Sequence, residues 1–194
     1  MATSKIEICN SALSKLGVEP IASFAETSKA AVYCNLQYDK IRKKLLREHL
    51  WNFAIKRSSL AKLAAAPLFG YGAAFQLPSD CIMPLTTNQG IDFEEEGKTL
   101  LMNSDSCILQ YISDITDVSY FDVAFEEALS YMLASDLAYP FKQSSTLADS
   151  LYQKAKMELA NARFYDAKVG RTGDTKKIQE DVWLNSRISG LDSD

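Results

Sequence analysis

Two stretches of sequence decide the fold: YDKIRKKLLREHLWNFAIKR at residues 38–57 and FGYGAAFQLPSDCIMPL at residues 69–85. In the first, Tyr38, Ile41 and Leu45 stand three and four residues apart, which is the spacing of a helical apolar stripe. The aromatic residues Trp51 and Phe53 follow the basic end of this stripe. The second stretch combines glycines, aromatic residues and a Leu-Pro pair, which indicates a loop leading into a strand. The chain is therefore expected to change from helix to strand in the second of these stretches.

Composition is typical of a globular protein. The chain has 194 residues, 47% of them hydrophobic and 24% charged, so we expect one domain or one domain with a small insert. No window has the apolar length of a membrane helix, and residues 1–17 do not read as a signal peptide. Cys9, Cys34, Cys81 and Cys107 are widely spaced, and His49 is the single histidine. We therefore expect a soluble protein from a reducing compartment, with free cysteines and no metal or other cofactor.

Apolar periodicity predicts the elements. Stripes of helical spacing occur near residues 6–16, 31–45, 121–133 and 147–162, and Pro140 is expected to end the third helix. Short strand-like runs occupy residues 75–77, 81–85, 91–93, 99–102 and 107–112. The predicted fold is mainly α: a four-helix bundle from residues 1–66 and 120–170, an inserted β subdomain at 67–119, and an extended C-terminal arm at 171–194.

No catalytic motif stands out. His49 lies late in a basic helix, where a histidine commonly interacts with free carbonyls and the helix dipole. Glu94, Glu95 and Glu96 could supply the two carboxylates of a polysaccharide- or cell-wall-degrading enzyme. The same cluster also fits a solvated, charged edge strand that resists aggregation. We expect the protein not to be an enzyme, and we keep the hydrolase as the alternative.

Charge of opposite sign is segregated along the chain. The segment 40–62 is basic and the segment 92–127 is acidic, while the net charge is −4. Three interpretations are open: complementary contacts between identical subunits, a solvated surface, and DNA binding by the basic segment. The first is favoured, with interface candidates Lys40, Arg42, Lys43, Lys44, Arg47, Arg57, Glu94, Glu95 and Glu96. Tyr38, Trp51 and Phe53 are expected to be core anchors.

The last 24 residues are polar with a few apolar positions, among them Trp183. Such a segment cannot build a core of its own. Trp is strongly enriched at binding hot spots, so docking on a partner is one interpretation, and folding back onto the chain's own helices is the other. The candidate docking residues are Ile178, Val182, Trp183, Leu184 and Ile188.

Several ordered blocks carry a family resemblance: ICNSAL at 8–13, LGVEPI at 16–21, LWNFA at 50–54, LPSDC at 77–81 and YISDITD at 111–117. Together they resemble the tail tubular protein A family, the head-to-tail adaptor (connector) proteins of short-tailed bacteriophages. The resemblance spans roughly residues 5 to 165. Leu50 stands where the family pattern leads us to expect a proline, which alters one turn, and nothing beyond Gly170 matches.

The resemblance implies a structural virion protein of the phage neck and tail, assembled in the bacterial host cytoplasm. It implies a ring of twelve identical subunits that joins the portal protein to the tail nozzle. Double-stranded DNA would pass through the ring during ejection without sequence-specific binding. In such adaptors the helices form the ring body, the β insert faces the tail, and the C-terminal arm reaches the portal. The membrane is not among the expected partners.

Overall fold

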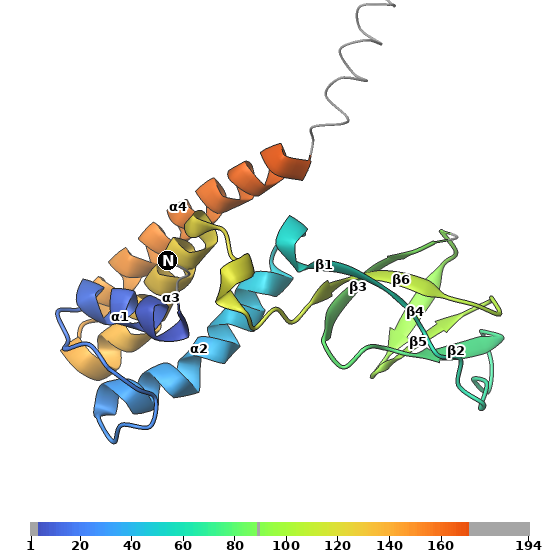
Figure 1. Cartoon of the computed structure of the whole chain (residues 1–194), viewed down its shortest axis with the longest axis horizontal. Coiled ribbons are helices and arrows are strands. Elements are labelled where there is room, and N and C mark those ends of the chain that lie inside the picture. The colour runs from blue at the N-terminus through green and yellow to red at the C-terminus, as the bar shows by residue number, and fades with distance from the viewer. Residues whose placement is uncertain (1–3, 89, 171–194) are drawn as a thin grey trace, which may run out of the picture.

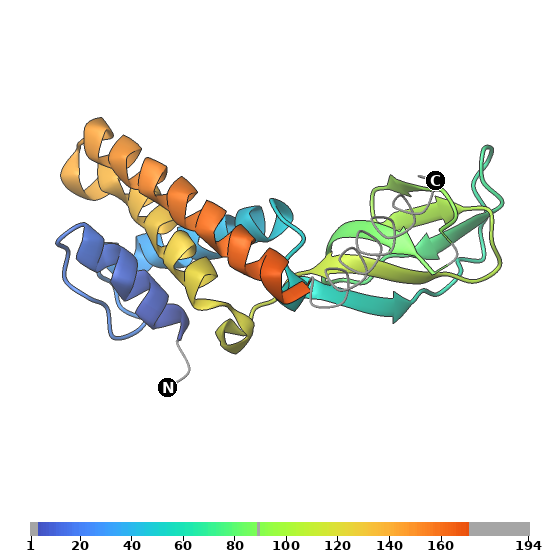
Figure 2. The same cartoon turned by 90° about the horizontal axis from the view of Figure 1, so that it is seen from above.

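The computed structural model of the protein describes residues 4–88 and 90–170. Four helices gather at one end of the molecule and two small sheets at the other (Figures 1 and 2). The helices are α1 (Lys5–Lys15), α2 (Lys29–Arg47), α3 (Val123–Lys142) and α4 (Ser145–Gly170), with short 3₁₀ turns η1 (Asn52–Ala54) and η2 (Val118–Tyr120). The strands are β1 (Ile55–Ser59), β2 (Ala73–Gln76), β3 (Cys81–Thr87), β4 (Phe93–Glu96), β5 (Thr99–Met102) and β6 (Ile108–Ser113).

The prediction of a mainly α four-helix bundle is wrong, because the fold is mixed α/β. Two three-stranded antiparallel sheets stand beside the four helices. The strands begin at Ile55, within the segment 1–66 that was expected to be helical. The sequence of β1, IKRSS, has no apolar alternation, and its half-buried and exposed positions explain why no local pattern marked it. Its pairing partner β6 lies about fifty residues further along the chain.

Local signals explain where the first two helices begin. Ser4 and Glu7 form a capping box, in which the Glu7 N–H donates to Ser4 Oγ at 3.1 Å and the Ser4 N–H donates to the Glu7 carboxylate at 2.6 Å. The hydroxyl of Ser28 caps α2 by accepting from the Ala31 N–H at 3.2 Å. After α1 the chain turns at Gly17, whose φ of +60° favours glycine.

Helix α3 is the centre of the helical domain, since α1, α2 and α4 all pack against it. An aromatic cluster closes the end of this core nearest the sheets. The Phe125 ring lies 5.0 Å from the Trp51 ring, 5.2 Å from the Phe53 ring and 4.9 Å from the Phe121 ring, measured between centroids. Edge-to-face contacts of this kind add to the stabilisation from burial. The aromatic turn after α2 therefore belongs to the core.

Two further observations concern the end of α3 and the apolarity of the helices. Helix α3 continues through Pro140 to Lys142, so the expectation that the proline ends it is wrong by a short margin. Pro140 cannot donate a helical hydrogen bond and stands in the last turn of α3, and Gln143 with φ of +50° ends the helix instead. Within residues 4–88 and 90–170, none of the helices has the length and apolarity needed to cross a membrane.

The two sheets have the orders β1-β6-β3 and β2-β5-β4. Strand β6 is central to the first sheet, and its inward side chains Leu109 and Tyr111 pack with Phe75, Leu100 and Met102 of the second. These residues form a core separate from the helical core. The register between β3 and β6 is irregular at two places, one of them next to Pro84, which cannot donate to the ladder.

The chain crosses between the two regions twice, at neighbouring positions. It leaves the helical domain after Ala54 and returns after Ser113, and the buried Ser113 hydroxyl donates to the Ala54 carbonyl at 2.8 Å. The indole of Trp51 fixes the outgoing crossing by donating to the Leu45 carbonyl at 2.9 Å. We call the sheets and their loops, residues 55–113, the β subdomain.

Candidate functional site

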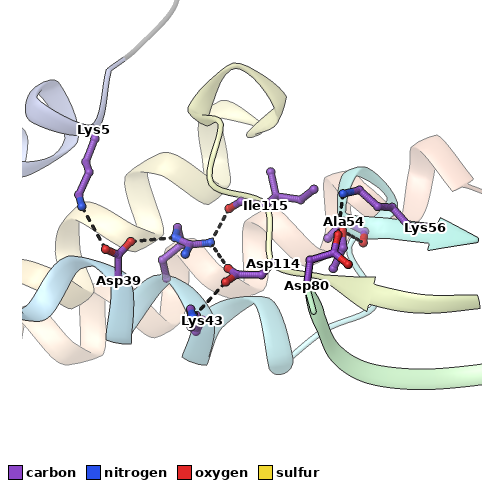
Figure 3. Close-up of polar contacts among 10 residues, drawn as sticks. Lys5, Asp39, Lys43, Ala54, Lys56, Asp80, Asp114 and Ile115 are labelled. Atoms are coloured by element: carbon purple, nitrogen blue, oxygen red, sulfur yellow. Dashed lines mark hydrogen bonds and ion pairs between the residues drawn. The ribbon is translucent and has the colours of Figure 1, made fainter. Parts of the chain in front are cut away.

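The junction between the two regions is built around a buried arginine. Arg42, only 1% exposed, donates to the carboxylate of Asp114 and to the carbonyl of Ile115, just after the chain returns from β6 (Figure 3). Its Nε atom lies 3.4 Å from Asp39 Oδ1, and Asp39 in turn pairs with Lys5 of α1 at 3.1 Å. This network joins α1, α2 and the start of the return segment, so it holds the β subdomain against the helices.

Arg42 was expected at a subunit interface, and the structure corrects this. Its guanidinium pairs with groups of its own chain, and a side chain that is this buried cannot contact a neighbouring subunit. The sequence did carry a signal for this position. Arg42 stands four residues after Tyr38 and four before Leu46, which are both buried, so it falls on the inner face of α2.

Asp114 also receives the ammonium group of Lys43, whose Nζ lies 3.0 Å from Oδ2. Burial alone would raise the pKa of Asp114. Hydrogen bonds from Arg42 and Lys43 outweigh that effect and hold the pKa below its ordinary value. Asp114 is therefore a stable carboxylate that bridges α2 and β6 across the junction.

A second carboxylate, Asp80, lies beside the first. Lys56 of β1 reaches it at 2.9 Å, the Tyr111 hydroxyl donates to it at 3.0 Å, and its carbonyl accepts from the Asp114 N–H at 2.7 Å. Burial opposes ionisation of Asp80, but the contacts with Lys56 and Tyr111 lower its pKa overall. Burial and the hydrogen bond to Asp80 raise the pKa of Tyr111 to about 12. The start of β3 is thereby fixed to the junction.

A groove of about 430 Å³ opens between α2 and the start of β3. We call it the basic groove. Its helical wall carries Lys40, Lys43, Lys44 and Arg47, and its other wall comprises residues 79–82 and Asp114. In the described part of the chain, Lys40, Lys44 and Arg47 form no ion pair. Three cations thus line a hollow without an internal counterion in direct contact.

The acidic cluster lies on a free edge of the second sheet. Glu94, Glu95 and Glu96 are exposed along β4, which among the described strands pairs with β5 alone. In the described residues none of the three forms an ion pair with a lysine or arginine. Glu94 and Glu96 line a hollow of about 380 Å³ together with the loop at residues 67–71. We call β4 with this loop the acidic edge.

The acidic edge is a poor setting for a general acid. A catalytic carboxylic acid needs a raised pKa, which enzymes obtain by burying the group in an apolar pocket. All three glutamates lie exposed on an edge strand, and their alternation places Glu94 and Glu96 on one face with Glu95 on the other. The arrangement favours a charged surface over the hydrolase that the sequence left as an alternative.

The contacts of His49 are structural, because they join α4 to the corner that follows α2. Its Nε2 atom lies 3.2 Å from Asp166 of α4, and its ring meets the Trp51 ring edge-on at 4.7 Å. Asp166 also accepts from the Asn52 backbone N–H at 3.0 Å, while its own carbonyl accepts from the Asn52 side chain. These contacts attach the last turns of α4 to the corner that follows α2.

The remaining predicted residues fall in different places. Arg57 is exposed on β1 and is not among the groove-lining residues. Tyr38 and Trp51 are fully buried, and Phe53 is half-buried against the helical core. The candidate arm residues Ile178, Val182, Trp183, Leu184 and Ile188 lie outside the described residues. In residues 4–88 and 90–170 no cluster of histidine, cysteine or acidic residues could hold a metal ion.

Sequence reasoning missed two contributors. Residues 79–82 supply the second wall of the basic groove, and the apolar residues Leu68 and Phe69 stand beside the glutamates. Comparison with known proteins adds no identification, because no protein-family model matches the chain and no curated protein matches it significantly.

Proposed function

We propose that the chain is a structural subunit that assembles head-to-tail into a ring through its basic groove and acidic edge. In the context of the resemblance stated above, the ring would be the twelve-subunit adaptor between the portal and the tail nozzle of a short-tailed phage. Double-stranded DNA would pass through its channel, and the virion neck would be its location. The C-terminal arm, residues 171–194, would contact the portal.

The observation that carries the proposal is that three groove cations and the three β4 glutamates do not pair with each other, although neighbouring charges such as Lys43 and Asp114 do. Lys40, Lys44 and Arg47 line the basic groove beside α2, and three glutamates lie on strand β4 of the β subdomain (Figure 1). Each set lacks ion-pair partners among the described residues. A second copy supplies the missing partners for both sets at once.

The contact is heterologous, since one surface of a subunit meets a different surface of its neighbour. Heterologous contacts produce rings when the rotation between neighbours closes and filaments when it does not. Charged residues across such a contact fix register and speed encounter more than they add affinity. Association should therefore weaken as salt screens the pairing, with a screening length of about 10 Å at 0.1 M.

In the proposed ring, the channel would hold DNA only weakly. The chain is acidic, with a net charge of −4, and binding that follows phosphate neutralisation requires an excess of cations. If the groove cations are occupied by a neighbour's glutamates, few remain to hold the duplex. A weakly binding lumen lets DNA slide, as a conduit for ejection requires.

A charge-swap experiment tests the proposal. One variant carries Lys40→Glu and Lys44→Glu, and the other carries Glu94→Lys and Glu96→Lys. Each alone should fail to assemble in sedimentation velocity, because like charges face each other. An equimolar mixture should restore assembly, since every contact then joins opposite charges in alternating order. Electron micrographs of wild-type and mixed samples should show closed rings.

The control variant carries Lys154→Glu and Lys156→Glu, which reverse two exposed charges on the outer side of α4. It should assemble like the wild type. The proposal is wrong if the wild-type protein stays monomeric at tens of micromolar in low salt, or if the mixture fails to recover. Steeply salt-dependent binding of DNA by the monomer, lost in the Lys40→Glu/Lys44→Glu variant, would instead assign the groove to nucleic acid.

A further inference from the structure

The loop at residues 67–71 displays two large apolar side chains to solvent. Leu68 is fully exposed and Phe69 is 88% exposed, and they are adjacent in sequence. The loop turns at Gly70, whose φ of +86° strains any other residue type, and the Tyr71 N–H donates to the Phe69 carbonyl at 3.1 Å. Single exposed apolar residues are ordinary, but two together on a built turn favour contact with a partner.

The outer face of α2 shows a matching pattern. Val32 and Leu36, about 55% exposed, stand four residues apart and so lie on one face. Lys40 follows Leu36 by about one turn and lines the basic groove, while Lys44 lies about 80° further around the helix than Leu36. The exposed side of α2 is therefore apolar in its first half and cationic in its second half.

The two surfaces also match in order. At the acidic edge, Phe69 and Leu68 line the same hollow as Glu94 and Glu96, so apolar and anionic groups are neighbours. On α2, Leu36 precedes Lys40 by one turn and Lys44 by two turns, about 6 and 12 Å along the axis at 1.5 Å per residue. A glutamate paired with the lysines thus leaves the loop within reach of Val32 and Leu36.

The contact cannot form inside one chain as it is folded. The loop lies between β1 and β2 at the end of the β subdomain furthest from the helices, whereas Val32 and Leu36 lie in the first half of α2 (Figures 1 and 2). Since the complementary surface belongs to the same sequence, a second copy is the partner that satisfies both the charges and the apolar groups.

We propose that the 67–71 loop is the apolar anchor of the subunit contact and that Leu68 and Phe69 pack on Val32 and Leu36 of a neighbouring copy. This inference rests on the proposed self-assembly and adds a specific site to it. Charge pairing orients the neighbours, and burial of the two loop side chains supplies most of the affinity. Fully burying one such side chain strengthens association by about tenfold or more.

The first test compares association constants by sedimentation equilibrium at 0.5 M salt, where charge pairing is screened. Changing Leu68→Ser and Phe69→Ser, or Val32→Gln and Leu36→Gln, should weaken association at least about 100-fold, the factor that corresponds to two lost side chains. A control with Met157→Gln and Phe164→Gln, two exposed apolar residues of α4, should leave it unchanged. Unchanged association of the loop variant overturns the inference.

The second test locates the contact. Cys9, Cys34, Cys81 and Cys107 are replaced by serine or alanine, after which Phe69→Cys is introduced in one preparation and Leu36→Cys in another. A short bismaleimide should link the two preparations into a mixed dimer. Replacing the second partner by Met157→Cys should give no such product, and an equal yield with that partner overturns the inference.

The experiments distinguish failure of the proposed self-assembly from failure of the proposed loop contact. Loss of recovery in the charge-swap mixture removes self-assembly through these surfaces, and the loop contact falls with it. Recovery of the mixture together with an unaffected Leu68→Ser/Phe69→Ser variant leaves the ring in place and removes only the anchor.

Discussion

The helical domain and the β subdomain differ in how much of their apolar surface each buries alone. The helical core extends from α1 to α4, and aromatic rings close its junction end. The β core is a smaller cluster between two three-stranded sheets, and its outer loop leaves Leu68 and Phe69 in water. The difference indicates that the helices form the stable body, whereas the β subdomain has surface left over for neighbours.

The largest effects should come from truncating one phenylalanine in each core. Phe125 and Phe75 are both fully buried, and Phe→Ala changes in cores cost about 3–5 kcal/mol. Phe125→Ala should destabilise the whole chain, because its ring supports both the helices and the crossing segment. Phe75→Ala should open the strands while the helices stay folded.

Hydrogen exchange resolved by peptide distinguishes these outcomes. In Phe75→Ala, amides of residues 73–102 should exchange faster while those of α3 keep their protection. Equal loss of protection in both regions would show that the two cores unfold as a single unit, and the helices would then not be the more stable of the two regions.

The next effect concerns the junction between the two regions. Arg42→Ala leaves Asp114 and the Ile115 carbonyl without their main donor, and removing one partner of a buried ion pair costs about 3–5 kcal/mol. Lys43→Ala removes the exposed partner of the same Asp114, and surface pairs contribute about 0–1 kcal/mol. Urea denaturation of the two variants measures the difference. Similar midpoints would mean that Arg42 does not hold the junction.

The smallest effect is expected with acid. Asp114 and Asp80 have pKa values lowered in the folded state, so they contribute stability that is present above the unfolded pKa of about 3.9 and is lost as the pH falls through their folded values. The urea concentration at the midpoint of unfolding should therefore decrease once the pH is lowered below about 4. Asp114→Asn should be less stable at pH 7 but show a shallower acid decline.

The exposed Asp149 of α4 offers the matched control for that titration. Asp149→Asn should follow the wild-type profile across the acid range. An acid decline in Asp114→Asn as steep as in the wild type would place the responsible carboxylates outside the junction.

Much of the helical region could be predicted from the sequence, because its signals are local. The capping box at Ser4 and Glu7 and the stripe through Tyr38, Ile41 and Leu45 concern residues three and four apart. Strand β1 could not be found this way, since its residues become a strand only by pairing with β6. The weight of the β region was therefore underestimated.

Some residues of the candidate site could likewise be predicted from the sequence, and others could not. Lys40, Lys44 and Arg47 could be found as a basic helix face, and the glutamates as an acidic run. The groove itself could not, because its second wall at residues 79–82 comes from another element. Arg42 was misplaced because its charge suggested solvent, although its spacing from Tyr38 and Leu46 placed it inside.

The hydrogen bond from Ser113 to the Ala54 carbonyl has a consequence for how this architecture can vary. The two ends of residues 55–113 lie side by side, so a short turn from Ala54 to Asp114 would close the helical domain without the strands. Insertions whose termini meet are tolerated when they enter at one narrow place on a folded host. We therefore expect the helical domain to accept an insertion of a different size in place of residues 55–113, with the Arg42–Asp114 pair kept at the junction.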